Sequence, residues 1–428
     1  MLNKVKNIIS KTDNFLFKKF GSNKGTKFLE NIKEAQIIFT SLNTINEEIN
    51  LKFVGGCVRK SLSGLVIDDI DLATTLHPNE VKKKLANMNI QSIDTGISHG
   101  TITAIINKKK FEITTLRKDI STDGRHAKVE FTLNWREDSL RRDFSINSIY
   151  VDSEGRIYDP QNGVADLKNG RVKFIGTPEE RIQEDYLRIL RYFRFFTEYS
   201  KFDHEKDVIL SIKKNINGIN KISNERIFDE LKKILKLDNL WNLFSDKKSK
   251  EIILTIFPQF KYYKRVKIIK NLKIKYEYHL ILAALLIDQS NEHEYFCHKY
   301  KTSNKLKEKL GFISKNFENL KNKNFYFEKN IKKLIYTHGK DKVRDLLFFS
   351  LCLSKKIDVA EIEKLIDFTK SYKVPRFPIS GDDLKVYGYE TGKLLGKKLK
   401  LLEEKWIEYN FVIKENFIEK YLGKVKEN

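Results

Sequence analysis

Two carboxylates lie two residues apart in an early apolar segment of the chain. Asp69 and Asp71 belong to the run IDDIDLATT, which is typical of a β-strand. Because side chains alternate along a strand, both carboxylates should project to the same face, about 6 to 7 Å apart along the backbone. Such a pair is suited to holding two divalent metal ions. Asp68 would project to the opposite face and is therefore left out of this site.

A candidate phosphate-binding turn precedes these carboxylates. Gly55 and Gly56 follow the apolar run 51–54, and because they lack Cβ atoms the backbone N–H groups of the turn can approach phosphate oxygens. Arg59 adds a guanidinium that can bind a phosphate through two hydrogen bonds. Each part alone is common in ordinary turns, but the combination within residues 53–75 predicts a site for a metal-bound triphosphate.

The segment 181–195, RIQEDYLRILRYFRF, combines carboxylates with arginines at helical spacing. On one helix, Glu184, Asp185 and Arg188 would share a face, and Arg191 would continue the arginine row. A carboxylate can accept from the exocyclic amine of cytosine or adenine while a guanidinium donates to the ring edge, whereas uracil and guanine reverse this order. The segment therefore predicts base selection by side chains. The alternative is an ordinary ion pair on a solvated helix.

The segment 141–147, RRDFSIN, supplies further polar groups for a nucleotide. Arg142 can pair with phosphates. Asp143 and Asn147 lie four residues apart and can hold the ribose hydroxyls that distinguish an NTP from a dNTP.

The overall charge is strongly positive. Lysine and arginine number 81 against 57 acidic residues, giving a formal net charge of +24. A charge of this size attracts phosphate backbones and predicts salt-dependent binding to nucleic acid. The alternative is a compositional bias, because lysine is abundant along the whole chain.

Features that would indicate export or membrane insertion are lacking in the sequence. The N-terminal residues 1–20 are amphipathic and lysine-rich without an apolar signal core, and no segment approaches the ~18 apolar residues of a membrane span. The three cysteines are scattered singly, which is typical of a reducing compartment. We therefore expect a cytoplasmic protein without a membrane anchor.

The chain changes character near residue 155. Before it, short apolar runs alternate with helical stretches, which predicts an α/β domain, and after residue 176 the pattern is helical to the end. The expected organisation is an N-terminal helical extension (1–27), an α/β head (28–155), and helical neck (156–235), body (236–374) and tail (375–428) domains. In the tail we expect an N-capped helix after the linker VPRFPIS, and an apolar core stripe of Leu394, Leu395, Leu399, Leu402 and Trp406.

These motifs, in their order, resemble those of a known family. The segment 53–75 is followed by GISHGTITA (96–104), FEITTLR (111–117), DGRHAKVEF (123–131), RRDFSINSIYVD (141–152), YDPQNGVADL (158–167), RIQEDYLRILRYFRF (181–195) and SNERIFDEL (223–231). Over about the first 235 residues the chain resembles the class II tRNA nucleotidyltransferases (CCA-adding enzymes) and bacterial poly(A) polymerases, a branch of the DNA polymerase beta superfamily. The segment 377–384 more loosely resembles the C-terminal part of the alphaproteobacterial branch.

The resemblance implies a fold, a reaction and roles for residues. It implies a polymerase-beta-like head and two-metal nucleotidyl transfer that adds C, C and A to tRNA from CTP and ATP. It implies two Mg²⁺ ions on Asp69 and Asp71, with Glu112 of the segment KFEITTL as a third carboxylate. It also implies that the residues named above in the glycine turn, RRDFSIN and EDxxR contact the nucleotide. One position departs from the family pattern, because Lys60 stands where an aspartate is usual.

Three functions remain open at this point. CCA addition is favoured by GISHGTITA, by the lack of the Gly-basic-basic-Phe run of the poly(A) polymerases, and by the presence of residues 118–140, a region that CC-only enzymes lack. The alternatives are poly(A) or A-only addition, and a non-enzymatic basic RNA-binding protein on the same fold. We expect tRNA as the partner and infer no obligate protein partner.

Overall fold

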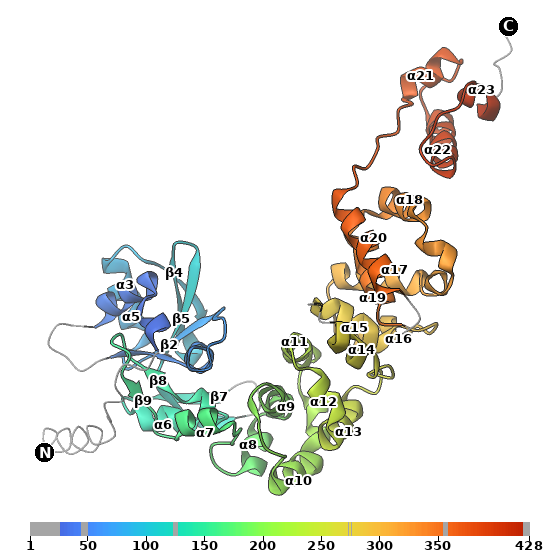
Figure 1. The fold of residues 1–428 in the computed structure, drawn as a ribbon. Coiled ribbons are helices and arrows are strands. Elements are labelled where there is room, and N and C mark those ends of the chain that lie inside the picture. Colours follow the sequence, from blue (N-terminus) through green and yellow to red (C-terminus); the bar gives the residue numbers. More distant parts are fainter. Residues whose placement is uncertain are drawn as a thin grey trace, which may run out of the picture. The chain divides into compact units, whose positions relative to one another are not determined.

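The computed structural model describes residues 26–43, 50–122, 127–272, 274, 276–353 and 358–422 (Figure 1). Nearly all of the predicted N-terminal extension, residues 1–25, lies outside them. The chain divides into two compact units, residues 1–252 and 253–428, and each is described by itself. In the described ranges, no helix has the length and apolar character needed to span a membrane.

The first unit begins with a seven-stranded mixed sheet. Its strand order is β3-β4-β5-β2-β1-β8-β9, and within it the neighbours β2 and β5 run parallel whereas the other paired strands are antiparallel. The strands are β1 (Leu51–Val54), β2 (Ile70–Thr74), β3 (Gln91–Gly96), β4 (Thr101–Ile106), β5 (Lys109–Thr115), β8 (Tyr150–Val151) and β9 (Ile157–Tyr158). β2 therefore lies in the interior of the sheet, between β1 and β5.

Helices cover one face of this sheet. They are α2 (Lys27–Glu30), α3 (Lys33–Leu42), α4 (Gly56–Leu62) and α5 (Pro78–Asn87), and their apolar residues form one buried cluster with Leu72 of β2 and with Phe111 and Ile113 of β5 (Figure 1). Because side chains alternate along a strand, Asp71 and Glu112 project to the opposite face. That face carries a smaller buried cluster that includes Ala73 and Tyr150.

A β-hairpin and a short helix separate β5 from the RRDFSIN segment. β6 (Arg117–Thr122) pairs with β7 (Ala127–Phe131), with a register irregularity between Asp119 and Ser121, and α6 (Trp135–Leu140) follows. Asn134 caps this helix, since its side chain accepts hydrogen bonds from the N–H groups of Arg136 and Glu137. The hairpin and α6 therefore occupy the region expected from sequence to precede RRDFSIN.

Helices make up the remainder of the first unit. They are α7 (Gly163–Asn169), α8 (Pro178–Glu184), α9 (Leu187–Tyr199), α10 (Lys206–Asn215), α11 (Asn224–Leu235), α12 (Trp241–Ser245) and the start of α13 (Lys247–Ile256). α11 begins after Ser223, whose side chain makes no capping hydrogen bond. Phe144 of the RRDFSIN segment packs with Phe195 of α9 at 5.3 Å between ring centroids, so this segment joins the helical core.

The second unit is helical throughout its described residues. Its helices after α13 are α14 (Arg265–Leu272), α15 (Tyr278–Leu286), α16 (Glu292–Lys299), α17 (Asn304–Lys315), α18 (Glu328–His338), α19 (Lys340–Ser350), α20 (Val359–Ser371), α21 (Gly381–Val386), α22 (Lys393–Glu408) and α23 (Phe417–Leu422). Every residue of α15 from His279 to Leu286 is buried. The predicted class, an α/β head followed by helices, is confirmed, while the boundaries at 155, 235 and 375 stay predictions.

The C-terminal helices match the predicted pattern with one exception. Ser380 caps α21 in a capping box with Asp383, as expected for the helix after the linker. Of the apolar stripe on α22, Leu402 and Trp406 are buried, and Leu395 and Leu399 pack against them. Leu394 is 60% exposed, so its assignment to the core was wrong. It is the second residue of α22.

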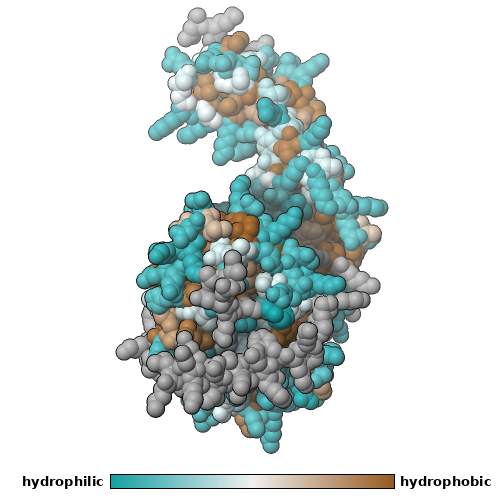
Figure 2. Space-filling view, turned by 90° about the vertical axis from the view of Figure 1, so that its left-hand side faces the viewer, coloured by the Kyte–Doolittle hydropathy of each residue, from teal (hydrophilic) through white to brown (hydrophobic). Residues whose placement is uncertain are grey.

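The described surface is rich in polar side chains. On the face shown in Figure 2, hydrophilic residues predominate and are interspersed with hydrophobic ones. This agrees with a chain in which 32% of residues are charged.

Candidate nucleotide and metal site

The three predicted metal-binding carboxylates lie on neighbouring strands. Asp69 directly precedes β2, and Asp71 is the second residue of that strand. In the sheet register Asp71 is opposite Val54 of β1 and Glu112 of β5. Parallel pairing therefore places Glu112 directly beside Asp71, on the same face of the sheet.

The surroundings of Asp71 favour a cation. Burial raises the pKa of Asp71 to about 6, the nearby Glu112 and Asp69 carboxylates add to the shift, and Arg142 and Arg59 oppose it. The donor set is made of carboxylate oxygens, which suits Mg²⁺. Within the described part of the chain, no group of three or more His, Cys, Asp or Glu side chains is arranged to hold a metal ion. The roles of Asp69, Asp71 and Glu112 as metal ligands therefore stay predictions.

The glycine turn lies against the Asp71 carboxylate. Gly55 has a positive φ of 73°, a conformation that favours glycine. A Cβ atom on Gly55 would lie 3.5 Å from Asp71 Oδ2 and 3.8 Å from Arg142 Nη1. Gly56 is the first residue of α4, and an added Cβ there would meet no atom within 4 Å. The turn thus brings backbone, carboxylate and guanidinium together, as the predicted triphosphate site requires.

Arg59 is more enclosed than the sequence suggested. It is 4% exposed, its Nε donates a hydrogen bond of 3.1 Å to the Tyr199 hydroxyl, and its Nη1 donates to Asn147 Oδ1. The guanidinium also lies over the ring of Phe195, 4.5 Å from its centroid. Both aromatic residues belong to α9, about 140 positions away, so no local sequence pattern predicts these contacts.

Asp143 and Asn147 form one buried network with two arginines. Asp143 Oδ1 accepts a hydrogen bond of 2.8 Å from Asn147 Nδ2, and Asp143 Oδ2 accepts one of 2.6 Å from Arg191 Nε. Although burial opposes ionisation, the Arg191 guanidinium holds the pKa of Asp143 well below its usual range. With Arg59 bound to Asn147, the four predicted nucleotide contacts therefore form one hydrogen-bonded network.

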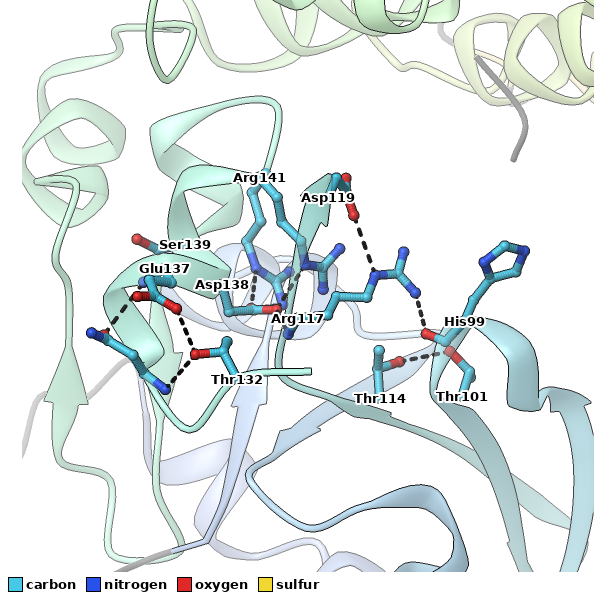
Figure 3. A network of polar contacts seen from close by, with 12 residues as sticks. His99, Thr101, Thr114, Arg117, Asp119, Thr132, Glu137, Asp138, Ser139 and Arg141 are labelled. Atoms are coloured by element: carbon cyan, nitrogen blue, oxygen red, sulfur yellow. Dashed lines mark hydrogen bonds and ion pairs between the residues drawn. The ribbon is translucent and has the colours of Figure 1, made fainter. Parts of the chain in front are cut away.

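Arg142 is held by Asp138 of α6, a residue that the sequence analysis did not single out. Asp138 Oδ2 accepts hydrogen bonds from Arg142 Nη2 at 3.1 Å and Nε at 3.2 Å. Asp138 Oδ1 accepts from Arg141 Nε at 2.7 Å, and Figure 3 shows this pair at the base of the β6–β7 hairpin. The available signal was the spacing, because an acid three and four residues before two arginines on a helix predicts ion pairs.

The EDxxR segment is not one helix. α8 ends at Glu184, Asp185 is extended with φ −152° and ψ 104°, and α9 begins at Leu187. The prediction that Asp185 shares a helix face with Glu184 and Arg188 is therefore wrong. Asp185 Oδ1 accepts from the Leu187 N–H at 3.1 Å, so its side chain competes with helical hydrogen bonding at this point.

The predicted base-selecting side chains Glu184, Asp185 and Arg188 each form an ion pair. Glu184 Oε2 lies 2.6 Å from Arg188 Nη1 despite the helix break. Asp185 Oδ2 is bound by Arg226 Nη2 of α11 at 2.7 Å, so its ion-pair partner comes from another helix. Arg226 belongs to the motif SNERIFDEL, which had been noted without a role for the arginine.

The segment 181–188 is hydrogen-bonded to the backbone of the RRDFSIN segment. Arg181 Nη2 donates to the carbonyl oxygens of Arg141 at 2.6 Å and Arg142 at 2.7 Å. Arg188 Nη1 in turn donates to the Arg181 carbonyl at 2.8 Å, and its Nη2 donates to the Arg141 carbonyl at 3.4 Å. The predicted base-selecting residues and the predicted triphosphate residues are therefore joined by hydrogen bonds.

The fold and the candidate site together define a nucleotidyltransferase of the polymerase beta type. Asp71 lies on an interior strand of the mixed sheet, Asp69 directly precedes that strand, and helices follow the sheet. Residues 51–173 match the family of the poly A polymerase head domain, and residues 201–264 match the family described as the probable RNA and SrmB-binding site of polymerase A.

Comparison with whole proteins extends this assignment. The chain is 34% identical to the mitochondrial CCA tRNA nucleotidyltransferase 1 of Mus musculus, over 93% of this chain and 91% of the relative. It is 32% identical to the CCA-adding enzyme of Lactobacillus helveticus, over 86% of this chain and 92% of the relative. The crystal structure of the Bacillus stearothermophilus CCA-adding enzyme in complex with CTP is similar in fold, with a TM-score of 0.67 at 23% identity, covering 88% and 93% of the two chains. The chain belongs to the CCA-adding enzyme family, which confirms the resemblance.

Proposed function

We propose that this protein adds C, C and A in turn to the 3′ end of tRNA from CTP and ATP, releasing pyrophosphate. The observation that carries the proposal is the similarity to CCA-adding enzymes over 93% of the chain. Asp69, Asp71, Asp185 and Arg188 are all present in the sequence, which argues against a decayed enzyme that only binds RNA.

The carboxylate end of the site serves the metal ions. We assign Mg²⁺ to Asp69 and Asp71, with Glu112 beside them, because oxygen donors and the raised pKa of Asp71 fit a divalent cation. Bound Mg²⁺ supplies activation of the primer 3′-hydroxyl and neutralisation of the leaving pyrophosphate. The Gly55 turn keeps the backbone close to Asp71, and Arg142 also lies beside Gly55. The triphosphate would therefore bind a guanidinium next to the carboxylates.

We assign binding of the ribose to two side chains that other residues hold in place. Asp143 and Asn147 are fixed by Arg191 and Arg59, so these two side chains need little rearrangement to bind ribose hydroxyls.

Arg188 and Asp185 present a donor and an acceptor for the base edge. Arg188 is held by Glu184 and by the Arg181 carbonyl, and Asp185 is held by Arg226. Cytosine and adenine have an exocyclic amine that can donate to Asp185 and a ring acceptor for Arg188, so both hydrogen bonds form. UTP and GTP would instead leave desolvated groups unpaired.

Counting added nucleotides tests the proposal. Purified protein with Mg²⁺ is incubated with tRNA ending at the discriminator base, at C or at CC, and with CTP, ATP or both. We expect three, two and one nucleotides to be added when both are present. Extended poly(A) on generic RNA would indicate the poly(A) alternative, addition only to the CC end would indicate A-only addition, and tRNA binding without extension would indicate an RNA-binding protein.

The compartment is a separate question. The relatives from Mus musculus and Homo sapiens are named as mitochondrial enzymes. The cytoplasmic location expected from the sequence stays a prediction, which imaging of a tagged protein tests.

A further inference from the structure

Tyr199 is the last residue of α9 and lies on the helix face that carries predicted nucleotide contacts. Side chains on this face recur every three or four residues along the helix, and they are Arg188, Arg191, Phe195 and Tyr199. Arg188 and Arg191 contact the RRDFSIN segment, as described above. Phe195 and Tyr199, towards the C-terminal end of the face, both contact Arg59 of α4. One face of α9 is therefore joined both to RRDFSIN and to the helix that follows the glycine turn.

Tyr199 contacts Arg59 with both its hydroxyl and its ring. The hydroxyl accepts the hydrogen bond of 3.1 Å from Arg59 Nε, and the guanidinium carbon lies 5.4 Å from the centroid of the Tyr199 ring. Burial raises the pKa of Tyr199, so the hydroxyl stays neutral and Arg59 is the charged partner. Because the Nε–H lies in the plane of the guanidinium, this hydrogen bond limits the rotation of that plane.

Arg59 in turn orients the side-chain amide of Asn147. Arg59 Nη1 donates to Asn147 Oδ1, and Asn147 Nδ2 donates to Asp143 Oδ1 at 2.8 Å. The carbonyl end of the amide is therefore held by a donor and the amine end by an acceptor, so a flip of the amide would break both hydrogen bonds. The orientation of the amide decides whether Asn147 offers a donor or an acceptor to a ribose hydroxyl. A chain of hydrogen bonds thus leads from Tyr199 to the predicted ribose contacts.

We propose that Tyr199 is a positioning residue for recognition of the ribose, which acts by orienting Arg59 and, through Arg59, the Asn147 amide. This inference rests on the proposed function, since it requires that Asp143 and Asn147 bind the ribose of CTP and ATP. A nucleotide that lacks the 2′-hydroxyl gains nothing from an oriented amide. The role of Tyr199 should therefore appear in the preference for a ribonucleotide over a deoxyribonucleotide.

The choice of base should not depend on Tyr199. Arg188 lies near the opposite end of α9, where Glu184 and the Arg181 carbonyl hold it. Both of these partners belong to α8, so a change at Tyr199 leaves them in place. Loss of ribose recognition without loss of base recognition separates this role from a general loosening of the site.

Tyr199→Phe tests the proposal, with Tyr262→Phe as a matched control. The Tyr262 hydroxyl donates to Asp288 Oδ2 at 2.8 Å, and the Arg265 guanidinium carbon lies 4.0 Å from the centroid of its ring, in the second unit. For Tyr199→Phe we expect the CTP to dCTP ratio of kcat/KM on one tRNA to fall about fivefold, while the CTP to UTP ratio stays within about twofold of the wild type. For Tyr262→Phe we expect both ratios to stay within about twofold.

Arg59→Lys gives the test a second arm, because it keeps the positive charge but removes the Nε–H that binds Tyr199. It should lower the CTP to dCTP ratio at least as much as Tyr199→Phe does. The double variant should fall no further than Arg59→Lys alone, since both changes interrupt the same chain of hydrogen bonds.

Three results would overturn the proposal. They are a wild-type CTP to dCTP ratio in either single variant, an equal fall of the CTP to UTP ratio in Tyr199→Phe, and a double variant that loses the sum of the two effects. If the wild type extends no tRNA, the proposed function fails, and calorimetric binding of CTP and dCTP by the same variants still decides the role of Tyr199.

Discussion

Lys60 and Asp68 form an ion pair beside the start of β2, where the predicted metal-binding carboxylates Asp69 and Asp71 lie. Lys60 lies in α4 and Asp68 directly precedes Asp69, so the pair joins the helix after the glycine turn to the entry of β2. The family usually has an aspartate where this chain has Lys60. The structure therefore gives the departure a local reason, because the lysine has an acidic partner eight residues later.

Reversing the charge of Lys60 should impair the enzyme when Mg²⁺ is scarce. Lys60→Asp removes the positive charge that pairs with Asp68 and adds a carboxylate near Asp68 and Asp69. The side chains of Lys60 and Asp68 are 24% and 67% exposed, so their ion pair contributes only about 0 to 1 kcal/mol to stability. We expect activity at limiting Mg²⁺ to fall a few-fold and the melting temperature to change little. The double variant Lys60→Asp/Asp68→Lys should recover most of the loss, and equal or greater loss in the double variant would show that the pair does not act as a unit.

Removing the paired carboxylates should stop the chemistry but leave RNA binding. Asp69→Asn and Asp71→Asn each remove one oxygen donor with little change in shape, so we expect nucleotide addition to fall by at least about a thousandfold. Binding of tRNA in a filter assay should change by less than about twofold, since it depends on the basic surface. Retention of more than a few per cent of the activity by both variants would contradict the metal assignment.

Strand β2, which contains Asp71 and which Asp69 directly precedes, could be predicted because alternation is a local property. The position of Glu112 came only from the resemblance, since the parallel pairing of β2 with β5 brings together residues about 40 positions apart. The helix break at Asp185 could not be predicted from spacing, because EDxxR satisfies a helical pattern. The break arises because the Asp185 side chain accepts a hydrogen bond from the Leu187 backbone N–H. Asp138 was missed because its donors come from β6, from the residues after α6 and from β8.

Asp71 should make the metal-free protein less stable as the pH rises. Its folded pKa is raised to about 6 from the usual 3.8, so its contribution to stability is full below about pH 4 and is lost as the pH rises through about 6. In EDTA, the melting temperature of Asp71→Asn should therefore exceed that of the wild type by roughly 2 to 5 °C at pH 8, and the difference should shrink towards pH 4.5. Saturating Mg²⁺ should reverse the order at pH 8, and a difference independent of both pH and Mg²⁺ would argue against this account.

Arg188 and Arg226 should affect base choice in different ways, because each supports a different half of the base-reading pair. Arg188→Ala removes the donor itself and should raise UTP or GTP incorporation tens of times relative to CTP and ATP, about 1 to 3 kcal/mol of discrimination. Glu184→Gln keeps Arg188 and its contact with the Arg181 carbonyl, so it should relax selectivity less.

Arg226→Ala leaves Arg188 in place but releases Asp185, whose Oδ2 it binds at 2.7 Å. We expect the preference for amine-bearing bases to fall by about tenfold, while the KM for tRNA stays within about twofold. Arg344→Ala is the matched control, since Arg344 forms a similar 2.7 Å pair with Asp341 in the second unit. Single incorporation of all four NTPs on one tRNA measures these ratios. If Arg226→Ala lowers every rate equally and leaves the CTP to UTP ratio unchanged, Asp185 does not read the base, and its bond to Arg226 serves only to join α11 to the helix break.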